Sequence, residues 1–175
     1  PLIISIPHAG TYVPDEIKKR FTAEALELPD TDWHVPLLYE DFVRANKVTR
    51  IQANYSRYVV DLNRPPDDAP LYPGQTKVSL CPDQTFDGDD IYLPGQAPDD
   101  REIQERVRKY WQPYHGELQK QIDRIIKKHG GAIVYDAHSI RSEVSRLFKG
   151  KLPDLNLGTA KGTSCSGKMA KAAFN

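Results

Sequence analysis

The sequence predicts an α/β fold, in which a mostly parallel sheet is flanked by helices. Two short apolar runs, at 2–6 and 132–136, have the length, the β-branched residues and the flanking turn residues of buried strands. Apolar residues at helical spacing recur in two longer segments between them, at 30–45 and 100–128. Strands that alternate with helices are typical of parallel sheets, because a parallel pair of strands needs a crossover connection.

In the first half of the chain, we expect three strands and two helices. They are strand 2–6, helix 15–21, helix 30–45, strand 48–53 and strand 58–62. The second helix begins with Asp30 or Thr31 as its cap and tolerates Pro36 in its first turn. A long, proline-rich loop follows over 65–98, and its apolar residues indicate a structured loop rather than a disordered linker.

One long helix dominates the second half. It begins near residue 100, carries a single apolar face and ends before Gly130, and Pro113 is expected to kink it. The later elements are expected to be strand 132–136, a short strand at 155–157 and a helix from about Ser166. We treat residues 1–175 as a single α/β domain of hydrolase type that is incomplete at its carboxyl end.

The overall composition argues against several classes of protein. The 175 residues include 24 Lys and Arg and 24 Asp and Glu, so no basic surface for a nucleic acid or an acidic membrane is expected. No apolar run approaches the roughly 18–20 residues of a membrane span, and no signal peptide is visible. Cys81 and Cys165 lack metal-site spacing and are interpreted as free thiols. We therefore expect a cytoplasmic protein and leave its oligomeric state open.

Polar residues with metal-binding chemistry follow two of the predicted strands. His8 and His138 lie just past the carboxyl ends of strands, the edge at which open α/β sheets bind ligands. Asp30, Asp32 and His34 open the helix between them. Two imidazoles and one carboxylate at one rim indicate a metal site with an open position, and zinc is the metal that suits them best. Taken locally, Asp30 and Asp32 are equally typical of a helix cap.

Three arginines lie in short loops at strand ends. They are Arg57, Arg64 and Arg141. A guanidinium group matches a carboxylate in two-point geometry, so three at one rim predict a small anionic substrate. Salt bridges to the many nearby aspartates are the alternative. His115 and His129, on the long helix and at its end, are expected to be structural.

Six segments resemble a known family and keep its order over nearly the whole chain. They are SIPHAG (5–10), DTDWHV (30–35), SRYVVDLNRP (56–65), LYPGQ (71–75), DAHSIRS (136–142) and LNLGT (155–159). The chain thereby resembles the N-formylglutamate amidohydrolase (N-formylglutamate deformylase) family. That family is similar in fold to zinc-dependent exopeptidases and zinc amidases.

The resemblance implies one zinc ion and its three ligands, His8, Asp32 and His138, with Asp32 preferred to Asp30. It implies hydrolysis of N-formyl-L-glutamate to formate and L-glutamate, a late step of histidine breakdown. Asn63 and Ser139 are expected to join the three loop arginines in holding the two carboxylates of the substrate. The general base is expected to be a glutamate beyond Asn175, so the catalytic residue is unknown within the chain.

Two other functions stay open at this point. One is a zinc amidase or carboxypeptidase that acts on other acylated amino acids or on peptidoglycan. The other is a catalytically inert homologue that only binds a ligand. A pocket sized for glutamate would separate the first alternative from a deformylase, and the zinc content of the protein would separate the second.

Overall fold

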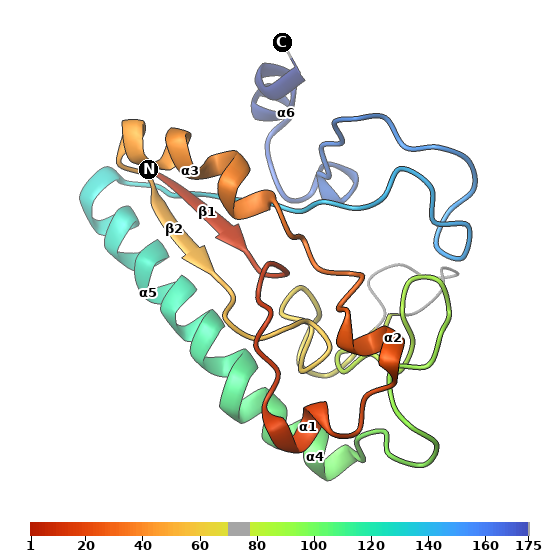
Figure 1. Ribbon diagram of the computed structural model, residues 1–175. Coiled ribbons are helices and arrows are strands. Elements are labelled where there is room, and N and C mark those ends of the chain that lie inside the picture. Colours follow the sequence, from red (N-terminus) through yellow and green to blue (C-terminus); the bar gives the residue numbers. More distant parts are fainter. Residues whose placement is uncertain (70–77, 175) are drawn as a thin grey trace. The chain divides into compact units, whose positions relative to one another are not determined.

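Three parallel strands form the centre of the first of two compact units in the computed structural model, which describes residues 1–69 and 78–174. Two of these strands are the red and orange arrows in Figure 1. The first unit is Pro1–Ile140, and the second is Arg141–Asn175. The sheet order is β2 (Thr49–Gln52), β1 (Leu2–Ile6), β3 (Ile133–Asp136). The predicted strand at 58–62 is not part of this sheet.

Strand β1 is the central strand and is parallel to both neighbours. Ile4 lies opposite Arg50 on one side and opposite Tyr135 on the other. Residues 3–6 of β1 are buried, as expected of a strand with neighbours on both edges. Because all three strands point the same way, the loops that leave β1 and β3 emerge at the same edge of the sheet.

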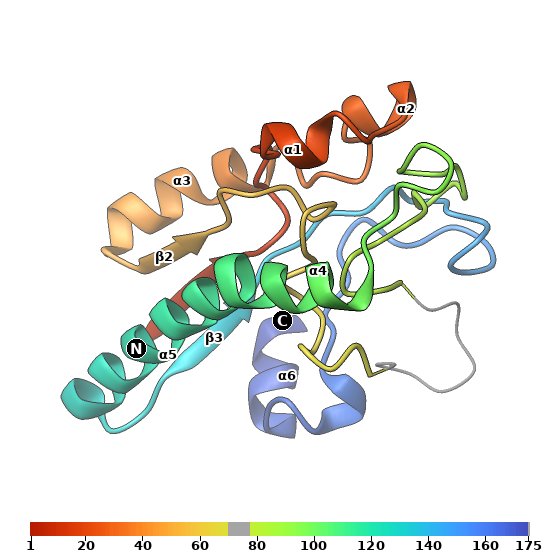
Figure 2. The same ribbon diagram turned by 90° about the horizontal axis from the view of Figure 1, so that it is seen from below.

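Helices cover both faces of β1. Ile4 and Ile6 pack against Val35 and Val43 of α3 (Val35–Asn46). On the opposite face, Ser5 Oγ lies 2.9 Å from the hydroxyl of Tyr114, which belongs to α5 (Gln112–His129). Figure 2 shows α3 and α5 on the two sides of the sheet. The α/β prediction is thus confirmed.

Helix α3 begins later than predicted. Its first residue is Val35 with Pro36 next, and His34 stands at the cap position without a capping hydrogen bond from its side chain. Asp30 does not cap this helix, because one oxygen of its carboxylate accepts hydrogen bonds from Tyr58 (2.7 Å) and from the backbone N–H of Phe86 (2.9 Å). The predicted helix at 15–21 is shorter, α1 (Asp15–Lys18), and a second short helix, α2 (Ala23–Leu26), follows it.

The long helix is confirmed, with one unexpected turn. Asp99 caps α4 (Asp100–Arg106), the π-helical turn η1 (Val107–Trp111) follows, and α5 continues to His129. This π-helical turn ends two residues before Pro113, and a kink at Pro113 itself stays a prediction. Proline lacks an N–H, and its ring crowds the carbonyl four residues earlier, which favours a wider turn at this point.

Residues 58–62 form turns instead of the predicted strand. Their carbonyl groups are bonded by a side chain of the long helix: Arg106 donates to the carbonyls of Tyr58 (3.4 Å) and Val59 (3.0 Å). Arg106 is 2% exposed, and its charge is paired with Glu102. The apolar Tyr58–Leu62 run is buried like a strand, but it pairs with no strand of the sheet: the N–H of Asp61 donates to the carbonyl of Leu80, and the carbonyls of Tyr58 and Val59 accept from Arg106.

The second unit contains little regular structure. A short 3₁₀-helix, η2 (Ala160–Gly162), precedes α6 (Gly167–Phe174), whose start agrees with the predicted helix from Ser166. The predicted strand at 155–157 does not form, and Leu155 is 90% exposed, so its apolar pattern has no buried face to support it. That the whole chain is one domain stays a prediction.

Two further sequence expectations can be compared with the structure. Cys81 and Cys165 are both free thiols, as predicted. Among the described residues, no helix is both long and apolar enough to cross a membrane. The LYPGQ segment at 71–75 lies outside the described residues.

Candidate metal centre

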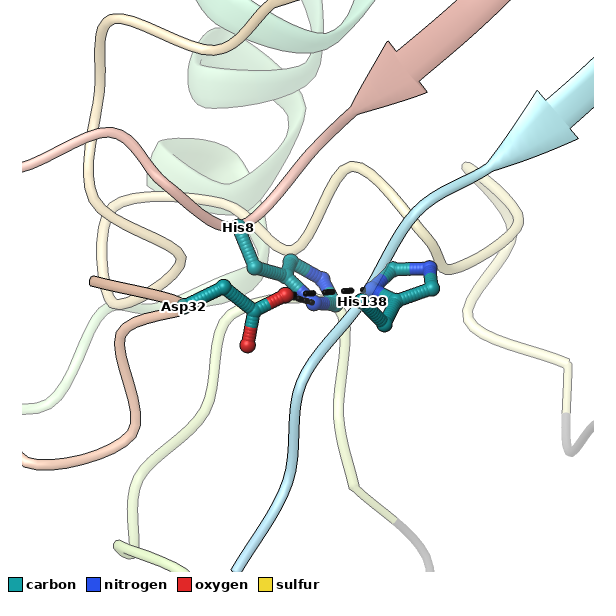
Figure 3. A group of neighbouring side chains, drawn as sticks. All are labelled: His8, Asp32 and His138. Carbon is teal, nitrogen blue, oxygen red and sulfur yellow. Dashed lines mark hydrogen bonds and ion pairs between the residues drawn. The ribbon is translucent and has the colours of Figure 1, made fainter. Parts of the chain in front are cut away.

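Three predicted ligands meet at the edge of the sheet. His8 follows β1, His138 follows β3, and Asp32 lies in the turn before α3 (Figure 3). A backbone hydrogen bond of 3.0 Å, from the N–H of Asp32 to the carbonyl of His8, joins that turn to the loop after β1. The potential ligand atoms of the three residues all lie within 4.8 Å of one another.

The two imidazole rings are oriented in the same way. His8 Nε2 is 2.7 Å from Asp61 Oδ1, and His138 Nε2 is 3.0 Å from Asp136 Oδ2. The Nδ1 atoms are the ones near Asp32, and they lie 3.9 Å and 3.3 Å from its Oδ2. Each histidine therefore has an outer carboxylate at Nε2 and turns Nδ1 to the centre, the arrangement that metal-binding histidines typically adopt.

The geometry of the three donors fits a zinc ion. Ligand atoms at roughly 2.0–2.1 Å from a tetrahedral zinc lie about 3.3 Å from one another. The distance from Asp32 to His138 has this value, the distance from Asp32 to His8 exceeds it by 0.6 Å, and all donor atoms lie within 4.8 Å of one another, so the side chains would have to draw closer together to hold the ion. Two imidazole nitrogens and one carboxylate oxygen are the donor set of a catalytic zinc with an open fourth position. The His138 side chain is 31% exposed, so the centre can be reached from solvent.

The protonation of the two histidines differs. Burial lowers the pKa of His8, and the charge of Arg57 lowers it further, so its ring is neutral and keeps a lone pair. Burial alone would also lower the pKa of His138, but its hydrogen bonds to Asp136 and Asp32 outweigh that effect and raise the pKa to about 9. At neutral pH His138 thus holds a proton beside Asp32, at the place that a cation would take.

Asp61, which sequence analysis did not single out, organises the buried side of the site. It is fully buried and accepts hydrogen bonds from His8, from Arg57 Nη2 (2.6 Å) and from the backbone N–H of Asn63 (2.9 Å). Burial favours its neutral form, but the charge of Arg57 and the hydrogen bond from His8 prevail and hold the pKa of Asp61 well below its usual range. The signal for Asp61 was its place at the end of an apolar run, the same signal that identified His8.

Arg57 lies inside the protein, although sequence analysis placed it among the substrate contacts. It is 5% exposed, pairs with Asp61, and stacks over the ring of Phe86 at 4.6 Å. Its Nη1 is 3.3 Å from His8 Nδ1, which requires that nitrogen to be the acceptor and leaves the His8 proton on Nε2. In this structure Arg57 therefore fixes the tautomer of His8, and its N–H occupies the Nδ1 lone pair that a metal ion would need.

The other predicted contacts lie nearer the surface. Asn63 is exposed, and its Nδ2 is 3.3 Å from His138 Nε2. Arg64 is half-buried, and its Nε has no hydrogen-bond partner among the described residues. Ser139 donates to Asp32 Oδ1 at 3.3 Å. Arg141 belongs to the second unit, so its place relative to these residues is not defined.

Comparison with known proteins identifies the family. A model of the N-formylglutamate amidohydrolase family matches residues 1–175. The chain belongs to this family. It is 47% identical over 171 residues to an N-formylglutamate deformylase of Pseudomonas putida, and 46% identical over 170 residues to one of Pseudomonas aeruginosa. These matches cover 98% and 97% of this chain, and the chain spans 63% of the length of each of these curated relatives.

Solved structures agree with the fold. An N-formylglutamate amidohydrolase from Ralstonia eutropha JMP134 superimposes with a TM-score of 0.68 at 25% identity, over 81% of this chain and 54% of that one. A gene product of Agrobacterium tumefaciens gives a TM-score of 0.66 over 85% of this chain and 55% of its own. The latter is 22% identical and supports the fold alone.

The loop that carries His8 leaves no room for a side chain at Gly10. A Cβ there would collide with the carbonyl oxygen of Tyr55, which is backbone and cannot turn aside. We predict that Gly10→Ala displaces this loop and weakens zinc binding about tenfold, as loss of ligand support typically does. Competition with a chromogenic chelator measures the affinity.

The matched control is Gly116→Ala. Gly116 lies in α5, and a Cβ there meets nothing within 4 Å, so this variant should keep the zinc affinity of the parent protein. Equal zinc affinity in Gly10→Ala and Gly116→Ala would contradict the role given to the close approach at Gly10.

Proposed function

We propose that this chain carries the metal centre of an N-formylglutamate deformylase, which hydrolyses N-formyl-L-glutamate to formate and L-glutamate. The convergence of His8, Asp32 and His138 at the carboxyl edge of the sheet is the observation that carries the proposal. The names of the two Pseudomonas relatives support the choice of substrate. Histidine breakdown as the pathway and the cytoplasm as the location stay predictions.

The proposed cofactor is one zinc ion. His8 and His138 would hold it through Nδ1, and Asp32 through its carboxylate. When bound, zinc supplies a Lewis acid for the formyl oxygen and lowers the pKa of water at the open position. Asp61 and Asp136 keep the two imidazoles turned toward the centre by accepting from their outer nitrogens.

The proposed substrate site lies beside His138. Asn63 reaches that histidine directly, and Arg64 follows it in the chain with an Nε that has no partner among the described residues. The Nε atom of Arg64 is itself buried, so we propose that the rest of its half-buried guanidinium group pairs with a carboxylate of the substrate. Arg57, Ser139 and Arg141 stay predicted contacts, and the glutamate base beyond Asn175 stays a prediction as well.

Removal of either histidine tests the metal assignment. We expect His8→Ala and His138→Ala each to lose zinc and formate release, because two remaining ligands do not retain the ion. The zinc content of the purified variants is measured by elemental analysis. His129→Ala, which removes an exposed histidine at the end of α5, is the control and should keep its zinc. Near-normal zinc in either test variant would refute the assignment.

A second experiment tests the charge of the substrate. N-Formyl-L-glutamine has nearly the shape of N-formyl-L-glutamate but lacks the side-chain carboxylate. If an arginine pairs with that carboxylate, the neutral analogue should lose about 3 kcal/mol, or roughly 150-fold in kcat/KM, because a guanidinium is left without its partner. Formate release from both compounds gives the ratio, and similar kcat/KM values would count against an arginine clamp.

A further inference from the structure

The segment Leu62–Arg64, which carries Asn63 and Arg64 to the proposed substrate site, is attached to the long helix by two side chains. Trp111 Nε1–H donates to the carbonyl of Arg64 at 2.9 Å. His115 Nε2 lies 2.9 Å from the carbonyl of Leu62. A carbonyl oxygen only accepts, so this nitrogen of His115 carries the proton.

Trp111 and His115 act as one unit. Their rings stack with centroids 3.7 Å apart and an interplanar angle of 24°. Four residues separate them, the spacing that places side chains side by side on a helix. Burial lowers the pKa of His115, so its ring is neutral and its single N–H is used for Leu62.

The π-helical turn η1 places a third side chain, that of Arg106, on the side of the long helix that faces residues 58–64. In a regular helix, Arg106 and Trp111 would point about 140° apart, because each residue turns the helix by about 100°. A π-helical turn closes over five residues and returns position i+5 to the face of position i. Arg106, Trp111 and His115 all bond carbonyls of residues 58–64, which agrees with this geometry.

On its other side, the segment is held by Asp61. The backbone N–H of Asn63 donates to Asp61 Oδ1 at 2.9 Å, and that of Arg64 donates to the carbonyl of Asp61 at 3.2 Å. Among the described residues, no strand pairs with this segment. Its backbone polar groups are therefore held by Asp61 at one side and by Trp111 and His115 at the other, while the Leu62 side chain packs in the hydrophobic core.

We propose that Trp111 and His115 are positioning residues that set the selectivity of the site for a substrate with a second carboxylate. They do so by fixing the backbone on which Asn63 and Arg64 stand, without contact to the substrate. This inference rests on the proposed function, because it assigns the carboxylate contact to that segment.

The test compares kcat and KM for N-formyl-L-glutamate and N-formyl-L-glutamine in zinc-loaded variants. Trp111→Phe and His115→Leu each remove one N–H donor and leave an apolar side chain in its place. We expect each to lower the preference for the charged substrate roughly tenfold, the value of one hydrogen bond, chiefly through KM. The zinc content should stay at that of the parent protein, because neither residue touches a metal ligand.

Two further variants separate positioning from a general loss of structure. His115→Gln places an amide N–H where His115 Nε2–H was and should restore the preference. His129→Leu makes the same chemical change at the exposed end of the same helix and should leave the preference unchanged. An unchanged preference in His115→Leu, or no recovery in His115→Gln, overturns the inference.

Formate release by the parent protein tests the proposed function separately. If it releases no formate although the predicted glutamate base beyond Asn175 is present, the deformylase proposal fails, and the inference is then judged by calorimetric binding of L-glutamate to the zinc-loaded protein. His115→Leu should weaken that binding roughly tenfold, and His115→Gln should restore it. Equal affinity in parent and His115→Leu, or no binding by the parent, overturns the inference.

Discussion

The buried carboxylate of Asp61 is the group on which the rest of the site depends. A buried charge is tolerated only when it is paired and hydrogen-bonded, and Asp61 has Arg57, His8 and the backbone of Asn63 as partners. The same three bonds orient three parts of the site. They fix the proton of His8 on Nε2, keep Arg57 beside His8, and hold the segment that bears Asn63 and Arg64. One side chain thus connects the candidate metal centre to the candidate substrate site.

The sheet positions His138, the second histidine of the candidate metal centre. Strands β1 and β3 are far apart in the chain but adjacent and parallel in the sheet, so the residues that follow them meet at one edge. Ser5 and Asp136 are opposite each other in the register, and Ser5 Oγ donates to Asp136 Oδ1 at 2.5 Å. Asp136 in turn orients His138. The orientation of His138 therefore depends, through Asp136, on Ser5 of the central strand, and the orientation of His8 depends on Asp61.

The sequence alone is sufficient to predict those helices and strands whose apolar residues recur at a regular spacing. The strands after which His8 and His138 stand, and the helix over residues 100–128, were predicted from their apolar spacing, and so was the meeting of the two histidines. The prediction of a strand at Tyr58–Leu62 is wrong. Any buried segment has a strand-like apolar composition, whether its carbonyls accept hydrogen bonds from a neighbouring strand or from side chains. Arg106 bonds the carbonyls of Tyr58 and Val59, and His115 bonds that of Leu62, across a π-helical turn that no apolar period reveals. The inward position of Arg57 was missed for a similar reason, since its pairing with Asp61 arises in a turn.

We propose that one zinc ion binds to Nδ1 of His8, Nδ1 of His138 and the carboxylate of Asp32. The decisive experiment is X-ray diffraction from crystals of the zinc-loaded protein, recorded on both sides of the zinc absorption edge. We expect one strong anomalous peak at bonding distance, about 2.0–2.2 Å, from these three atoms, with Asp61 and Asp136 at the outer nitrogens. A peak bonded to Nε2 of either histidine, or a peak elsewhere with none among these residues, would contradict it.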